Sequence, residues 1–282
     1  MSRVALAQIA PVLGDLEINL RLHLERIEAA RARGASLIVF PELSLTGYFL
    51  KDLTGDVAMP EDHPVLAAIA EASASIDVVA GYVALENDLA YIAAGYWSKG
   101  RLIHRHHKAY LPTYGMFEEA RFVTPGSRLR AFDGPLGRSA MLICEDLWHP
   151  STVGIVSVDG ADLLIAIAAS PARGFRGDRP DSARTYEQMT ELYARLHGLN
   201  VIFTNRVGFE DGVGFWGGSR IVDPFGSELA RAPYFEEALV IADLDLTASR
   251  RAHQLMPLTR DERPDLTLSE LQRILAKRAE RD

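Results

Sequence analysis

Short, almost wholly apolar segments recur along this chain, and segments with helical periodicity separate several of them. Buried strands are predicted at residues 4–9, 37–40, 78–83, 139–143, 163–168, 201–204, 220–222 and 239–242. Helices are predicted up to Gly34, over residues 64–75 and 182–196, and from about Leu268 onward. Residues 90–97 and 101–106 predict a hairpin. Strand-helix crossovers mixed with hairpins favour a layered α/β fold with mixed sheets covered by helices.

No internal repeat, low-complexity stretch or flexible linker divides the 282 residues. We therefore expect a single domain over residues 1–282, with its core at about residues 3–246 and a helical C-terminal extension at about residues 247–282. The net charge of −8 argues against a nucleic-acid partner, because phosphate neutralisation needs a basic face. No apolar run approaches the ~20 residues of a membrane helix, and the only cysteine excludes an internal disulfide. A cytoplasmic protein with no membrane partner is the expectation.

Three reactive side chains follow directly after apolar or alternating segments: Glu42, Lys108 and Cys144. Strand ends are where side chains converge on a pocket in α/β folds. A thiol there can attack a carbonyl or nitrile carbon while a carboxylate takes its proton. The ammonium would favour the thiolate and, with the backbone N–H of Glu145, stabilise the oxyanion. This chemistry needs neither a metal nor an organic cofactor.

Each of these residues also has an ordinary structural explanation. Cys144 could be a small buried apolar side chain, since free cysteine is among the most buried residue types. Glu42 could cap the segment that follows it, and Lys108 could be one more solvated charge in a polar run. Only their joint occurrence inside longer patterns distinguishes a site from three unrelated residues.

Those longer patterns resemble the carbon-nitrogen hydrolase family, also called the nitrilase superfamily. The matching segments are Phe40-Pro-Glu-Leu-Ser-Leu-Thr-Gly-Tyr48, His107-Lys-Ala-Tyr-Leu-Pro-Thr-Tyr-Gly-Met-Phe-Glu-Glu119, Cys144-Glu-Asp-Leu-Trp148, Ala169-Ser-Pro171, Asn205-Arg-Val-Gly208 and Phe215-Trp-Gly-Gly-Ser219. The resemblance runs over about residues 3–246, and the three catalytic segments stand in the family's order. It implies an α-β-β-α sandwich, usually paired into homodimers or larger homo-oligomers.

The resemblance also implies roles for individual residues. The family's catalytic glutamate, lysine and cysteine fall on Glu42, Lys108 and Cys144, and its second glutamate falls on Glu119, with the adjacent Glu118 as the alternative. Residues beside these segments are candidate substrate-binding residues, although core packing explains any one of them equally well: Tyr48, Tyr114, Phe117, Glu145, Trp148 and Ser170.

Two other groups of residues carry weaker signals. His104, His106 and His107 could suggest a metal site, but on a strand His107 points away from the other two, and no carboxylate or thiol is nearby in sequence. A surface strand without a metal is the expectation. The glycines at 212, 214, 217 and 218 are not a dinucleotide fingerprint, because no helix follows them. They predict a mobile loop or a tight passage of the backbone.

The predicted reaction is cysteine-dependent hydrolysis of a linear amide or N-carbamoyl amine, which releases ammonia through a thioester. The segments Leu111-Pro-Thr-Tyr-Gly115 and Cys144-Glu-Asp-Leu-Trp148 look closest to the glutaminase domain of glutamine-dependent NAD synthetases. We nevertheless expect no synthetase domain here, since no Gly-rich phosphate loop is present. Asn205-Arg-Val-Gly208 is more like stand-alone amidases and carbamoyl-amine hydrolases. A glutaminase that supplies ammonia to a separate synthetase, a nitrile hydrolase and a non-enzymatic interaction protein are the alternatives.

Overall fold

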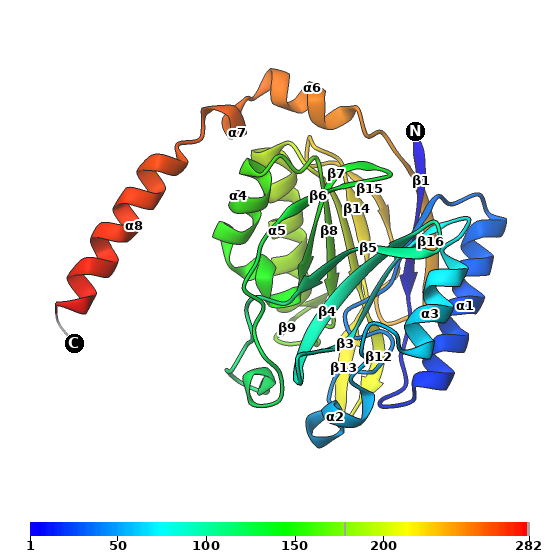
Figure 1. The fold of residues 1–282 in the computed structure, drawn as a ribbon. Coiled ribbons are helices and arrows are strands. Elements are labelled where there is room, and N and C mark those ends of the chain that lie inside the picture. The colour runs from blue at the N-terminus through cyan, green and yellow to red at the C-terminus, as the bar shows by residue number, and fades with distance from the viewer. Residues whose placement is uncertain (178, 281–282) are drawn as a thin grey trace.

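The computed structural model describes residues 1–177 and 179–280, and two six-stranded sheets packed face to face form its centre (Figure 1). The first sheet has the strand order β16-β1-β2-β3-β4-β5, and the second has the order β15-β14-β11-β8-β7-β6. The strands of the first sheet are β1 (Ser2–Gln8), β2 (Leu37–Val39), β3 (Asp77–Glu86), β4 (Leu89–Ser98), β5 (Arg101–His107) and β16 (Ala238–Leu244). Those of the second are β6 (Ala131–Gly134), β7 (Gly137–Ile143), β8 (Leu163–Ala168), β11 (Asn200–Asn205), β14 (Arg220–Val222) and β15 (Glu228–Arg231).

Both sheets mix parallel and antiparallel pairs. In the first, β1, β2 and β3 are parallel neighbours, whereas β4, β5 and β16 run antiparallel to the strands beside them. In the second, β7, β8 and β11 are parallel, with antiparallel strands at both edges. The carboxyl ends of the parallel strands in each sheet are therefore grouped, which is where a pocket forms in such folds.

Strand β1 shows why the sheets pack in layers. Val4 and Leu6 join the apolar cluster between the two sheets, whereas Ala5 and Ala7 join a second cluster beneath the helices of the first sheet. Successive side chains of a strand point to opposite faces. A strand that is apolar on both faces must therefore be covered on both sides.

Helices supply the outer layers of the molecule. Helices α1 (Leu16–Ala32) and α3 (Pro64–Ala72) cover the first sheet, and α4 (Pro150–Val158) and α5 (Asp181–His197) cover the second (Figure 1). The Asp15 side chain accepts a hydrogen bond from the Ile18 N–H and caps α1. Gly198 ends α5 in the left-handed conformation. The four layers confirm the predicted α-β-β-α sandwich.

Shorter elements connect these layers. They are η1 (Lys51–Leu53), α2 (Thr54–Val57), η2 (Glu119–Arg121), η3 (Cys144–Trp148), β9 (Phe175–Arg176), β10 (Arg179–Pro180), β12 (Val207–Glu210) and β13 (Val213–Trp216). The glycine-rich segment, predicted as a mobile loop or a tight passage, forms the β12–β13 hairpin followed by a tight passage. At Gly217 the φ angle is +70°, and a Cβ would lie 2.5 Å from the Gln8 side chain.

The segment after β16 is helical, with α6 (Ala248–Leu255), α7 (Leu258–Asp261) and α8 (Pro264–Ala279). Helix α8 points away from the sheets (Figure 1). It begins four residues before the predicted Leu268, because Pro264 suits the first turn of a helix. No helix among residues 1–177 and 179–280 is long and apolar enough to cross a membrane.

Candidate active site

Three candidate catalytic side chains meet where strands of both sheets end. Glu42 follows β2 and Lys108 follows β5 in the first sheet, and Cys144 follows β7 in the second. Relative exposure is 1% for Glu42, 0% for Lys108 and 7% for Cys144. Lys108 is therefore not a solvated surface charge, and burial of this ammonium requires partners of opposite charge.

Two carboxylates supply that charge. The Lys108 Nζ lies 2.8 Å from Glu42 Oε1 and 2.7 Å from Glu119 Oε1. The second oxygen of Glu42 accepts a hydrogen bond of 2.7 Å from the Ala169 N–H. Glu118 is exposed. Within the described residues, the structure brings Glu119 and not Glu118 to the ammonium.

The Glu119 carboxyl group has one satisfied and one unsatisfied oxygen. Oε1 also accepts a hydrogen bond of 2.5 Å from the Tyr48 hydroxyl, while the buried Oε2 has no hydrogen-bond partner in the part of the chain that is described. Burial, with the nearby negative charge of Glu42, raises the pKa of Glu119 to about 7, against the opposing effects of Lys108 and Tyr48. This group therefore changes its protonation close to neutral pH.

The Cys144 backbone adopts a conformation that is rare for a residue with a side chain. Its φ angle is +46°, at the first residue of η3. Such strain persists only where the surroundings hold it. Asp146 provides that hold, since its Oδ2 accepts a 3.0 Å hydrogen bond from the Ile143 N–H, just before the turn.

Asp146 also ties this turn to the segment that carries the lysine. Its Oδ1 accepts hydrogen bonds of 3.0 Å from the backbone N–H groups of Ala109 and Tyr110, directly after Lys108. His106 Nε2 lies 2.8 Å from Asp146 Oδ2. One buried carboxylate thus sets the position of the cysteine turn of one sheet relative to the lysine segment of the other.

The histidines of β5 differ from the surface strand that was expected. His106 is buried and bonded to Asp146, a carboxylate distant in sequence, so it does not lie on the surface. His104 stacks on Phe132, with ring centroids 4.0 Å apart, and His107 stacks on Tyr91. Among residues 1–177 and 179–280, no three His, Cys, Asp or Glu side chains are arranged to hold a metal ion.

The thiol itself has a hydroxyl neighbour. Cys144 Sγ lies 3.2 Å from the Tyr186 oxygen, and the Trp148 Nε1–H donates to that oxygen over 3.1 Å. Burial and the charge of Glu42 raise the pKa of the Cys144 thiol well above its usual value, although Lys108 and Tyr186 oppose the rise. Lys108 lowers the pKa of this thiol, as expected, but burial outweighs that effect, and attack by such a thiol calls for the carboxylate base predicted from the sequence.

The candidate substrate-binding residues make further contacts near these side chains. Tyr114 donates to the Glu145 carboxylate over 3.0 Å, and the Arg173 guanidinium lies over the Phe117 ring at 4.8 Å. Ser170 Oγ accepts a hydrogen bond of 3.1 Å from Trp216 Nε1. A cavity of about 250 Å³ adjoins Glu119 and is lined in part by Tyr48, Phe49, Met116, Phe117, Phe122 and Val213.

Three residues of this centre were not identified from the sequence: Asp146, Arg173 and Tyr186. Asp146 lies inside the segment Cys144-Glu-Asp-Leu-Trp148, but only the fold shows that it reaches the lysine segment. Tyr186 and Tyr193 share one face of α5 with the ordinary spacing of a packed helix. That spacing gives no signal that one of these tyrosines reaches a thiol 42 positions away in sequence.

Comparison with known proteins adds an independent observation. Residues 3–254 match the model of the carbon-nitrogen hydrolase family. A glutamine-dependent NAD(+) synthetase from Thermotoga maritima is 32% identical over 263 residues, which cover 92% of this chain and 44% of that protein. The chain thus spans less than half the length of this curated relative.

Two solved structures support the fold. A carbon-nitrogen hydrolase from Helicobacter pylori superimposes with a TM-score of 0.84 at 23% identity, covering 96% of this chain and 98% of that one. An amidase from Nesterenkonia sp. gives a TM-score of 0.81 at 23% identity, with 95% of each chain covered. At these identities the likeness concerns the fold alone.

Proposed function

Because this chain belongs to the carbon-nitrogen hydrolase family, we propose that it hydrolyses the C–N bond of a small amide through a thioester on Cys144. The observation that carries the proposal is the buried ammonium of Lys108, held between the carboxylates of Glu42 and Glu119 beside a buried thiol. Burying three charged side chains is unfavourable. Hydrophobic packing of the fold does not explain why they are buried. Such arrangements cluster at sites that do chemistry.

In the acylation step, Cys144 Sγ attacks the carbonyl carbon while its proton passes to Glu42. Because the thiol pKa is raised, attack and deprotonation have to be coupled, and Glu42 is the base. The negative charge that develops on the carbonyl oxygen faces Lys108 Nζ and the backbone N–H of Glu145. Collapse of this intermediate breaks the C–N bond, and Glu42 returns the proton to the leaving nitrogen.

Hydrolysis of the thioester repeats the sequence with water in place of the thiol. A carboxylate takes a proton from the water, the C–S bond breaks, and the sulfur is reprotonated. Glu119 Oε2 is suited to holding this water or the substrate nitrogen, because it is a buried acceptor to which no group of residues 1–177 and 179–280 donates. We assign Glu119 these positioning roles in addition to holding Lys108.

The substrate we propose is a linear amide or an N-carbamoyl amine. A second candidate, glutamine, has a specific observation in its favour. The carboxylate of Glu145 and the guanidinium of Arg173 both lie at the aromatic group formed by Tyr114 and Phe117. An α-amino acid carries an ammonium and a carboxylate, which these two side chains could bind. The NAD(+) synthetase relative is itself described as glutamine-dependent.

Ammonia release from a panel of glutamine, simple aliphatic amides, N-carbamoyl amines and nitriles tests both candidates. The proposal expects release that disappears in Cys144→Ala. If glutamine is the substrate, Glu145→Gln should raise its KM while leaving the KM for an uncharged aliphatic amide unchanged. Equal release by wild type and Cys144→Ala would overturn the proposed function.

We also propose that the protein is one domain that pairs with a second copy of itself. The outer faces of α4 and α5 expose the apolar side chains Ile155, Val158, Leu192 and Leu196. Apolar side chains exposed together are typical of interaction surfaces. Light scattering should give twice the monomer mass, and Leu192→Asp should shift the protein towards the monomer.

A further inference from the structure

Helix α5 places one tyrosine hydroxyl against the reactive sulfur. Tyr186 is 1% exposed, and its ring stacks on Phe203 with centroids 4.9 Å apart. Trp148 packs against the same ring edge-on, at 5.7 Å. These contacts leave the Tyr186 oxygen 3.2 Å from Cys144 Sγ, so the hydroxyl touches an atom that reacts.

The direction of this hydrogen bond follows from the neighbouring indole. An indole N–H can only donate, so the Tyr186 oxygen is the acceptor in its 3.1 Å contact with Trp148 Nε1. The single proton of the hydroxyl then remains available to the sulfur. Once the sulfur is a thiolate it can only accept, and the tyrosine must be the donor. Burial, with the adjacent sulfur, raises the pKa of Tyr186 well above its usual value, so the hydroxyl keeps this proton.

We propose that Tyr186 is a further catalytic residue, whose hydroxyl donates a hydrogen bond to the Cys144 sulfur whenever the sulfur carries negative charge. The inference rests on the proposed function, since it takes Cys144 as the nucleophile. No net proton transfer from the tyrosine is needed. In acylation the thiol proton goes to Glu42 as the S–C bond forms. In thioester hydrolysis the C–S bond breaks with its electron pair on sulfur, and Tyr186 stabilises that leaving thiolate until a proton returns.

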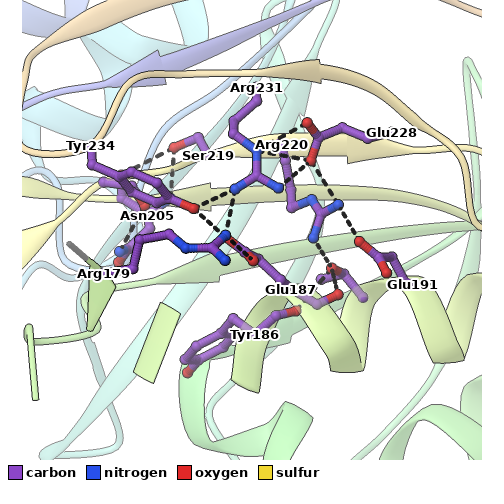
Figure 2. Close-up of polar contacts among 12 residues, drawn as sticks. Arg179, Tyr186, Glu187, Glu191, Asn205, Ser219, Arg220, Glu228, Arg231 and Tyr234 are labelled. Atoms are coloured by element: carbon purple, nitrogen blue, oxygen red, sulfur yellow. Dashed lines mark hydrogen bonds and ion pairs between the residues drawn. The ribbon is translucent and has the colours of Figure 1, made fainter. Parts of the chain in front are cut away.

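Helix α5 is anchored on the side away from the thiol, which keeps the hydroxyl in place. Figure 2 shows the Tyr186 ring pointing away from a polar network that joins α5 to β14 and β15. Glu187, the next residue, lies 3.1 Å from Arg179 Nη1 and 2.5 Å from Arg231 Nη1, and it accepts a hydrogen bond from Tyr234. One turn further along α5, the Glu191 carboxylate lies 2.7 Å from the guanidinium of the buried Arg220.

The test measures the alkylation rate of Cys144 by iodoacetamide against pH, without substrate, in wild type, Tyr186→Phe and Tyr193→Phe. Tyr193 is the matched control, because it lies two turns along α5 and its buried hydroxyl donates to the Leu147 carbonyl over 2.9 Å. Loss of a hydrogen bond to a charged group should slow alkylation at a fixed pH below the midpoint about 10- to 100-fold in Tyr186→Phe. The midpoint should rise by about one to two pH units.

The Tyr193→Phe midpoint should stay at the wild-type value, and melting temperatures should show that both variants fold. Trp148→Phe, which removes the orienting donor, should give a shift smaller than that of Tyr186→Phe. A lower midpoint in Tyr186→Phe would mean that the thiol donates to the tyrosine, and an unchanged midpoint would mean that the contact does not affect the thiolate. Either result overturns the inference. Because no substrate is present, this failure is distinct from the loss of the proposed function, which Cys144→Ala tests through turnover.

Discussion

Replacing Glu119 by glutamine removes one of the two negative charges that hold Lys108 while keeping the shape of the side chain. The carboxylate oxygen that changes lies 2.7 Å from the Lys108 Nζ and 2.5 Å from the Tyr48 hydroxyl. The amide oxygen can still accept both bonds, but as a neutral group. Hydrogen bonds to charged groups contribute about 1.5–3 kcal/mol, against about 0.5–1.5 kcal/mol for neutral pairs. The difference is about 1–1.5 kcal/mol per bond, so for the two bonds we expect a loss of about 2–3 kcal/mol in transition-state stabilisation, or about one and a half to two decades in kcat/KM.

Glu118→Gln is the matched control for this change. Glu118 is the adjacent residue, carries the same side chain and is exposed, and no ion pair joins it to another residue within 1–177 and 179–280. Surface substitutions of this kind usually change free energies by about 0.5 kcal/mol or less. Its kcat/KM should therefore stay within about twofold of the wild type.

The assay is ammonia release at several substrate concentrations, at a pH above about 7 so that Glu119 is ionised, with melting temperatures for both variants. A larger effect for Glu118→Gln would move the second-glutamate role to that residue. Two silent variants would mean that Glu42 alone holds Lys108 in a reactive position, and the reasoning from the ion-pair geometry would be wrong.

Other expected outcomes follow from the same site. Cys144→Ala should lose several decades of turnover yet melt near the wild-type temperature, and a chelator should leave the wild type unaffected. Lys108→Met should lose about two to three decades in rate and, unlike a surface change, should also lower the melting temperature, because two buried carboxylates lose their cation. Asp146→Asn should lower both kcat and melting temperature, since an amide nitrogen would face a backbone N–H donor. The pKa of Glu119, raised to about 7, means that the folded state binds the extra proton between about pH 4.5 and 7. The Glu119 contribution to the free energy of unfolding should therefore fall as pH rises through that range. Thermal melts at several pH values measure this pH dependence, which should disappear in Glu119→Gln.

The residues predicted from the sequence differ from those that were missed in one physical respect. Glu42, Lys108 and Cys144 each follow a recognisable strand, so their place at a strand end could be read from local patterning. Asp146 and Tyr186 join the candidate site through contacts with residues 37 and 42 positions away. Local periodicity contains no information on such distant contacts. The same limit explains His106, whose buried partner Asp146 lies 40 positions further on.

The elements that were not predicted from the sequence also have local causes. The hairpin of β12 and β13 was not predicted, because Gly208, Gly212 and Gly214 dilute the alternation that marks a strand. Helix α4 was not predicted, because apolar residues occur on its exposed side as well as its buried side, with Val153 and Val156 inside and Ile155 outside. Its amphipathic signal is therefore weak. The sheet order could not be derived from strand patterns alone, since pairing depends on contacts between strands distant in sequence.

The charge balance of the proposed reaction gives a reason for two carboxylates on one ammonium. Before attack, Lys108 is held by Glu42 and Glu119. In the proposed acylation Glu42 takes the thiol proton and becomes neutral, so its attraction for the ammonium weakens at the moment when the oxyanion forms. That oxyanion replaces the charge lost from Glu42, so the ammonium is not left without a counter-charge in a buried site. Glu119 does not receive the proton in this step and keeps Lys108 in position while its partner changes. With Glu42 as its only partner, the Lys108 ammonium could move with the Glu42 carboxyl group, or could move towards the substrate before the oxyanion forms. The second carboxylate therefore has its largest effect in the transition state, which is why Glu119→Gln is expected to lower kcat more than it raises KM.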